Sequence, residues 1–195
     1  MKSKNQEFKN KFSLKSAAGI LAALFILFGL TACNRDDDPK DDLPQEEMTN
    51  VILKVTDDAG TTVDYNYIIG GSSAPVIKLT DGKTYNVEAV FMNGSEDVTD
   101  EIRDAKDEHF LIYDFPKSEV TLTREDPASS TRADGAKVGL YTKWTVTKAV
   151  KSSSPVVKVT LIHEPASVNE AQNGTAWGSV TGGETDAEVT YGISN

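Results

Sequence analysis

The sequence predicts a mainly β domain, a single antiparallel β-sandwich of the immunoglobulin-like type with one short helix. Three observations predict this class. Apolar and polar residues alternate over short runs, turn-forming residues separate these runs, and only one segment has helical spacing. Many short alternating segments favour two packed antiparallel sheets over an α/β fold, in which strands and helices alternate.

The first two strands are expected to form a hairpin. Val51, Leu53 and Val55 fall on one face of an alternating run, and the turn-forming residues 57–60 follow it. The return strand would cover residues 61–69. Further strands are expected at residues 75–79, 84–92, 110–115, 119–123, 138–147, 156–163 and 187–193.

One segment has a helical pattern. Val98, Ile102, Ala105 and His109 are spaced to lie on one face of a helix over residues 97–109. We therefore expect a short helix that joins two strands.

The longest irregular stretch is residues 164–186, which contains three glycine-rich turn signals. Long loops in compact domains are often functional. Trp177 lies in this stretch, away from any alternating run. It is a candidate contact residue for a partner, and the alternative is a loop residue that covers the end of the core.

The N-terminus has the layout of a secretory signal. Five lysines in residues 1–15 precede an apolar run at residues 17–30, and Leu30-Thr31-Ala32-Cys33 follows. This last motif resembles a lipobox. The resemblance implies cleavage after residue 32 and attachment of lipid to Cys33, which would anchor the protein to a membrane. The alternative is an uncleaved membrane helix with an incidental cysteine.

Residues 33–48 are expected to form a lipidated, disordered tether, because they are acidic, contain two prolines and have few apolar residues. The run Asp36-Asp37-Asp38 resembles the export signals that send lipoproteins of Bacteroidota to the outer face of the outer membrane. The β-sandwich would then cover residues 49–195.

Removal of residues 1–32, which hold five Lys and one Glu, would change the formal net charge from −10 to −14. So acidic a chain argues against nucleic-acid binding. Cys33 is the single cysteine, so its lipidation would leave the domain without a disulfide or a thiolate ligand.

The sequence does not predict an enzyme. It contains no G-x-S-x-G elbow, no H-E-x-x-H motif and no pairing of cysteine with histidine for nucleophilic catalysis. The acidic residues are numerous enough to be explained by a solvated surface.

The two histidines are the candidate metal ligands. His109 follows Asp107 and Glu108, and His163 precedes Glu164 at the end of an expected strand. His109 is at the end of the expected helix. If this helix end lies close to the end of the strand that carries His163, the imidazoles and carboxylates would converge. Such a set suits Zn, Cu, Ni or non-haem Fe, and two axial imidazoles could hold a haem iron. The alternative is a pair of structural histidines that bond to nearby carboxylates.

Three stretches together resemble a family of small surface lipoproteins of Bacteroidota. They are DVTDEIRDAKDEHF, VTLIHEP and GGETDAEVTYGI. The family shares Asp-Glu-His, here residues 107–109, His-Glu-Pro, here residues 163–165, and Gly-Gly-Glu-Thr-Asp, here residues 182–186. One departure is visible, since the family often has Gln after Asp-Glu-His and this chain has Phe110.

Members of this family are often called type 1 periplasmic binding fold superfamily proteins. That name does not suit this chain, because such proteins have two α/β lobes and more than twice its length. The resemblance implies that this protein is an accessory partner of a TonB-dependent outer-membrane receptor. We therefore expect a lipid-anchored envelope protein that captures a metal ion or metal complex. The alternative is a structural or adhesive module that binds protein or glycan through its loops.

Overall fold

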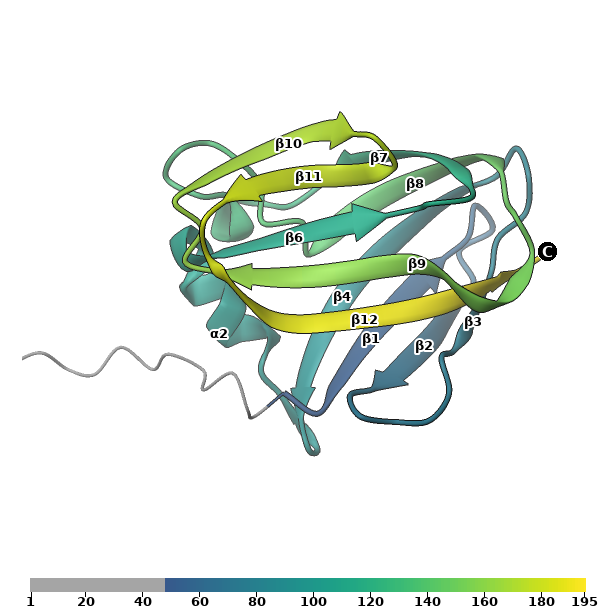
Figure 1. The fold of residues 1–195 in the computed structure, drawn as a ribbon, viewed down its shortest axis with the longest axis horizontal. Coiled ribbons are helices and arrows are strands. Elements are labelled where there is room, and N and C mark those ends of the chain that lie inside the picture. The colour runs from purple at the N-terminus through teal and green to yellow at the C-terminus, as the bar shows by residue number, and fades with distance from the viewer. Residues whose placement is uncertain (1–47) are drawn as a thin grey trace, which may run out of the picture. The chain divides into compact units, whose positions relative to one another are not determined.

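The computed structural model describes residues 48–195, which form two packed β-sheets and one short helix (Figure 1). The prediction of a mainly β sandwich is confirmed. The predicted signal peptide, Cys33 and residues 34–47 of the predicted tether lie outside the described residues. Met48, which the sequence assigned to the tether, is buried in the core.

The first sheet contains the N-terminal hairpin and four strands from the middle of the chain. Its order is β2 (Thr62–Ile68), β1 (Asn50–Thr56), β4 (Thr84–Asn93), β8 (Tyr141–Lys148) and β7 (Glu119–Arg124), and β5 (Glu96–Asp97) pairs with the end of β4. All its pairs are antiparallel.

The second sheet contains most of the C-terminal half. Its order is β10 (Ser167–Asn173), β11 (Ala176–Thr181), β6 (His109–Asp114), β9 (Ser152–His163), β12 (Glu184–Ser194) and β3 (Val76–Lys78). One pair departs from the predicted antiparallel arrangement, because β3 runs parallel to the end of β12. The chain crosses from the first sheet to the second between β2 and β3, which lets β3 enter alongside the last strand.

The core lies between the sheets and follows the predicted alternation. Val51, Leu53 and Val55 are buried, while the residues between them are partly exposed. Trp144 is fully buried, and the rings of Tyr113 and Phe115 meet it edge-on at centroid distances of 5.9 and 5.0 Å. Trp144 comes from β8, Tyr113 from β6, and Phe115 directly follows β6, so these three aromatic residues join the two sheets.

The predicted helix is shorter than expected. Helix α2 covers Thr99–Asp104, a 3-10 turn covers Lys106–Glu108, and His109 begins β6. Val98 and Ile102 are buried, as the helical spacing predicts, but the assignment of His109 to the helix was wrong. Within residues 48–195, no helix is long and apolar enough to span a membrane.

The prediction of an irregular loop over residues 164–186 was also wrong. This stretch contains β10, β11 and the first residues of β12. The strand β10 (SVNEAQN) is polar and mostly exposed, so it lacks the apolar alternation that identifies a half-buried strand. Asn173-Gly174, at the turn between β10 and β11, is a typical hairpin signal.

Candidate functional site

The two histidines lie opposite each other at one end of the second sheet. His109 begins β6 and His163 ends β9, and the register of this antiparallel pair places them side by side. Their rings are stacked, with centroids 5.1 Å apart and planes 8° from parallel. Figure 1 shows that α2 lies beside this end of the sheet.

The ring of His109 is held by the turn that precedes it. Its Nδ1 lies 3.0 Å from the carbonyl oxygen of Ala105. A carbonyl can only accept, so Nδ1 carries the proton of this bond and a neutral ring has a free lone pair on Nε2. Metal-binding histidines are commonly oriented by such a bond from the second ring nitrogen.

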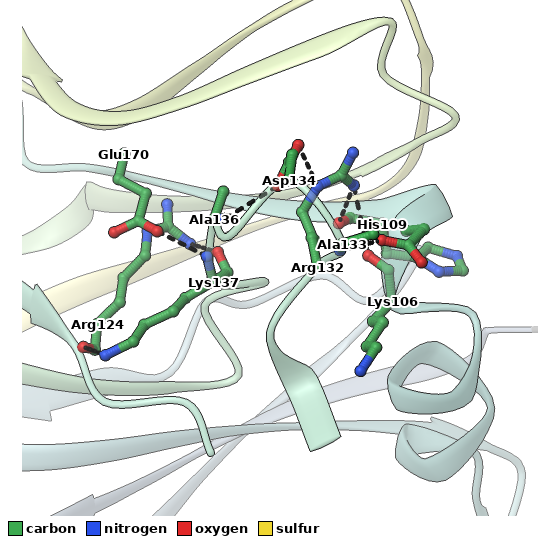
Figure 2. A network of polar contacts seen from close by, with 10 residues as sticks. Lys106, His109, Arg124, Arg132, Ala133, Asp134, Ala136, Lys137 and Glu170 are labelled. Atoms are coloured by element: carbon green, nitrogen blue, oxygen red, sulfur yellow. Dashed lines mark hydrogen bonds and ion pairs between the residues drawn. The ribbon is translucent and has the colours of Figure 1, made fainter. Parts of the chain in front are cut away.

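The backbone of His109 is held from the other side by Arg132. The Nη1 atom of Arg132 donates to the carbonyl oxygens of His109 and Lys106, at 3.1 and 3.3 Å (Figure 2). Arg132 is itself buried and pairs with Asp134 of the same loop, with Nε 3.2 Å from Oδ2. The loop over residues 132–137 therefore supports the start of β6.

The carboxylate that lies against both rings belongs to Asp186. Its Oδ2 is 3.6 Å from Nε2 of His109, and its Oδ1 is 3.7 Å from Nδ1 of His163. The side chain is 2% exposed. Within residues 48–195, the two histidines are its ion-pair partners. A buried carboxylate is stabilised by hydrogen bonds or by a positive partner, and a cation near the rings would be such a partner.

A β-bulge brings Asp186 to this position. Thr185 pairs with Ile162 and Ala187 pairs with Leu161, so Asp186 is an extra residue on β12. A bulge breaks the alternation of a strand and redirects a side chain, and bulges are frequent next to functional sites. Both Asp186 and Ala187 are buried as a result.

The contacts of the three acidic residues predicted as ligands direct the Asp107 side chain to the loop before β8 and join the backbones of Glu108 and Glu164. Asp107 accepts a bond from the backbone nitrogen of Ala133 at 2.6 Å. The carbonyl oxygen of Glu108 accepts a bond from the backbone nitrogen of Glu164, also at 2.6 Å. The side chain of Glu164 is exposed, and its φ of 48° lies in the left-handed region. The structure therefore brings His109 and His163 together with Asp186, a residue outside the predicted ligand set.

The site is not preorganised for a metal ion. Among residues 48–195, no group of three His, Cys, Asp or Glu side chains has the arrangement that holds one. An imidazole binds a metal through a lone pair in the plane of its ring, and two stacked parallel rings direct these lone pairs into different planes. A shared ion therefore requires one ring to turn. His163 has the freer ring, since its side chain is 21% exposed and that of His109 is 5% exposed.

Trp177 lies on β11 rather than in a loop. It is half-buried against the core, and its Nε1 donates to the carbonyl oxygen of Val120 on β7 at 2.9 Å. This bond joins the second sheet to an edge of the first. The contact matches the alternative interpretation, in which the indole covers the end of the core.

A second buried polar cluster surrounds Arg124. The guanidinium lies 4.2 Å above the ring of Phe110, and its nitrogens donate to the carbonyl oxygens of Leu111 at 2.6 Å and Val138 at 2.8 Å. Burial lowers the pKa of Arg124. Lys137, beside it in Figure 2, donates from Nζ to the carbonyl oxygen of Arg124 at 2.8 Å.

Asp126 completes this cluster. Its Oδ1 accepts bonds from the backbone nitrogens of Gly139 and Leu140, at 3.0 and 2.9 Å. Burial raises the pKa of the Asp126 carboxyl, and the backbone bonds and Arg124 oppose this effect. Arg124 is the last residue of β7 in the first sheet, and its side chain bonds Leu111 on β6 in the second sheet. The cluster therefore joins the two sheets.

Sequence reasoning missed Asp186, Arg124 and Asp126. The signal for Asp186 was the Gly-Gly-Glu-Thr-Asp motif, which ends on this residue. A bulge cannot be recognised from alternation alone. Arg124 and Asp126 carry no motif, and their burial depends on contacts with β6 and the loop before β8.

The comparisons with known proteins give no relative. No protein-family model matches this chain, no curated protein matches it, and no solved structure matches it.

Proposed function

We propose that this protein is a lipid-anchored binding protein at the surface of the outer membrane. It would capture a transition-metal ion or a metal complex through His109, His163 and Asp186, as an accessory to an outer-membrane receptor of the TonB-dependent kind. The lipid on Cys33 would supply the anchor. The immunoglobulin-like subclass belongs to the same proposal, supported by the buried Trp144 between two packed sheets.

The observation that carries the proposal is the buried carboxylate of Asp186 between two imidazoles. In a neutral His109 ring the Nε2 lone pair is 3.6 Å from a carboxylate oxygen. Two electron-rich atoms at this distance repel unless a proton or a metal ion lies between them. Two ligand atoms of a tetrahedral zinc site lie about 3.4 Å apart, since each bond is about 2.0–2.1 Å long.

Binding in this proposal begins with rotation of the His163 ring. The turn takes the ring out of the stack and directs one nitrogen toward the Asp186 carboxylate and Nε2 of His109. His109 stays in place because Ala105 and Arg132 hold it. Two imidazoles and one carboxylate then suit Zn, Cu or non-haem Fe, and an open ligand position would remain for a complexed metal.

Calorimetric titration with Zn²⁺, Cu²⁺ and haem tests the proposal. A soluble form that begins at Asp41 keeps all described residues and omits Cys33. We expect saturable binding of at least one of these probes, weakened at least about tenfold in Asp186→Asn. Glu164→Gln is the matched control, because this exposed carboxylate is adjacent to His163 in sequence but is not its partner.

Two results would reject the metal site. One is a wild-type protein that binds none of the three probes. The other is equal binding by the wild type and by the double variant His109→Ala/His163→Ala. Loss of binding in Glu164→Gln but not in Asp186→Asn would instead support the ligands predicted from the sequence.

A further inference from the structure

The loop that joins β2 to β3, residues 69–75, is flanked by exposed apolar side chains and is called the crossover loop below. Three of the four large apolar side chains that are exposed within residues 48–195 lie on it or beside it. They are Ile68 at the end of β2, Ile69 directly after it and Val76 at the start of β3, with exposed fractions of 56, 38 and 40%. Single apolar residues are usual on a protein surface, whereas a group of them points to an interaction.

The sequence around the crossover loop is free of charge. Residues 65–77 contain no Asp, Glu, Lys or Arg, although 26% of the chain is charged. Moving a charged side chain out of water is costly, and an uncharged surface avoids this cost. The crossover loop is therefore a part of this acidic protein that can approach an apolar phase.

Backbone bonds hold the crossover loop in its exposed position. The Ile69 nitrogen donates to the Thr49 carbonyl oxygen at 2.9 Å, and the Gly71 nitrogen donates to the Ile68 carbonyl oxygen at 2.9 Å. At the other end of the loop, the Pro75 carbonyl oxygen accepts a bond from β12 at 2.8 Å. Because the loop is tied at both ends, the exposure of the two isoleucines belongs to the folded structure.

The bond between Ile69 and Thr49 places the loop beside the point where the N-terminal chain enters the domain, since Thr49 directly precedes β1. Both interpretations of the N-terminal sequence, a lipidated Cys33 and an uncleaved apolar helix, attach the chain to a membrane before this point. Thr49 is 16 positions after Cys33, and a fully extended chain of this length spans at most about 55 Å. The membrane would then lie within this distance of Thr49.

We propose that Ile68 and Ile69 rest on the lipid bilayer to which the N-terminal segment attaches the chain. This contact rests on the membrane anchor of the proposed function and does not depend on the metal site. A few apolar side chains bind a membrane weakly on their own. A short tether raises their effective concentration at the bilayer to about the millimolar range, which makes a weak contact populated.

Charge on the other side of β1 determines which way the domain leans. The turn that joins β4 to β5 also contacts Thr49, whose Oγ1 accepts a bond from the Gly94 nitrogen at 2.8 Å. Figure 1 shows this turn and the crossover loop at the same end of the domain. The turn continues into Glu96 and Asp97, which are exposed. These carboxylates favour water, so the domain leans with its β2 side toward the lipid.

Chemical coupling of Cys33 to lipid tests this contact without relying on lipidation in the cell. A form that begins at Cys33 keeps all described residues and the single cysteine of the chain. Its thiol reacts with a maleimide-headgroup lipid in vesicles of phosphatidylcholine. Phosphatidylcholine that is brominated in its acyl chains then quenches the emission of a tryptophan that reaches the apolar layer.

Ile68→Trp is the reporting variant, and Ser95→Trp is its matched control. Ser95 is exposed in the turn between β4 and β5, so a tryptophan there is also close to the tether. The wild-type signal, which comes from the two native tryptophans, is subtracted. In brominated vesicles the added emission of Ile68→Trp should fall at least about twofold, and that of Ser95→Trp should stay constant. Adding Ile69→Asp to Ile68→Trp should restore the emission, because a carboxylate resists transfer out of water.

Unchanged emission of Ile68→Trp in the coupled protein overturns the membrane contact. Equal quenching of Ile68→Trp and Ser95→Trp would show that the tether alone brings the domain close to the lipid, and would also overturn it. If Ile68→Trp fails to fold, Ile69→Trp gives the same readout at the next residue. Because the anchor is coupled chemically, these results are separate from lipidation of Cys33 in the cell, which metabolic labelling with palmitate tests.

Discussion

Gly183 packs directly against the backbone of His163. A Cβ atom at position 183 would lie 2.7 Å from the His163 carbonyl oxygen and 2.8 Å from Cγ2 of Ile162. The φ of Gly183 is 84°, a conformation that side chains rarely adopt. The close approach lets β12 begin beside the end of β9, three residues before Asp186.

Gly183→Ala should therefore lower the free energy of unfolding by about 2–4 kcal/mol. A left-handed residue with a Cβ costs about 1–2 kcal/mol, and the clash with fixed backbone adds a packing cost. Urea denaturation of the soluble form measures the loss.

Gly182→Ala is the matched control for this loss. Gly182 has a φ of 66°, but its added Cβ would meet Ala166 at an ordinary 3.4 Å. We expect a loss of about 1 kcal/mol, from backbone conformation alone. Equal losses in the two variants would contradict the steric explanation.

Arg124→Met should lower the free energy of unfolding more than Lys158→Met, a substitution of an exposed basic residue. Without the guanidinium, the carbonyl oxygens of Leu111 and Val138 lose a buried donor, and Asp126 loses the favourable positive charge of Arg124. Removing one partner of a buried ionic cluster typically costs about 3–5 kcal/mol. Thermal and urea unfolding both report this loss.

Lys158→Met is the control for the loss of a positive charge. Lys158 pairs with Glu188 at 3.2 Å, and both side chains are well exposed. Such surface pairs contribute about 0–1 kcal/mol. A stability of Arg124→Met close to that of Lys158→Met would show that Arg124 is not part of the structural link between the sheets.

Much of the fold could be predicted because the core-facing strands alternate clearly. Val51, Leu53 and Val55 show this on β1, and the structure buries all three. Strands β10 and β11 could not be predicted in the same way. The side chains of β10 are largely exposed, and those of β11 are mostly only partly buried, so the pairing of these strands depends on backbone bonds that leave no clear apolar pattern.

The candidate site could be predicted only in part. His163 continues the row of Val157, Val159 and Leu161, and this placed it at a strand end. His109 was assigned to a helix, because the stripe of Val98 and Ile102 happens to continue to its position. The third member, Asp186, depends on a bulge, and sequence spacing does not reveal one.

The stability of the protein should depend on pH through Asp126. Burial raises the folded-state pKa of this carboxyl above its ordinary value of 3.8, so the folded state binds the proton more readily than the unfolded state. The free energy of unfolding should therefore fall as pH rises from about 4 through the raised pKa. Below this window, protonated Asp126 no longer opposes folding.

Asp126→Asn isolates this contribution. The amide oxygen can still accept the bonds from Gly139 and Leu140, but the side chain no longer titrates. The stability of wild type relative to Asp126→Asn should thus decrease with rising pH across the window. Urea midpoints of both proteins at several pH values measure the difference, and a difference that is independent of pH would contradict it.

Trp177→Phe tests whether the indole serves the fold or remains free for a partner. The substitution keeps an aromatic ring but removes the Nε1 donor to Val120, whose carbonyl lies in a buried residue. Leaving a buried acceptor unpaired costs about 1–3 kcal/mol, so we expect a loss in this range by urea denaturation. Tyr141→Phe is the control, because its hydroxyl bonds Arg103 at 3.3 Å in a partly exposed position and should cost less. Unchanged stability in Trp177→Phe would favour the role predicted from the sequence, a contact residue for a partner.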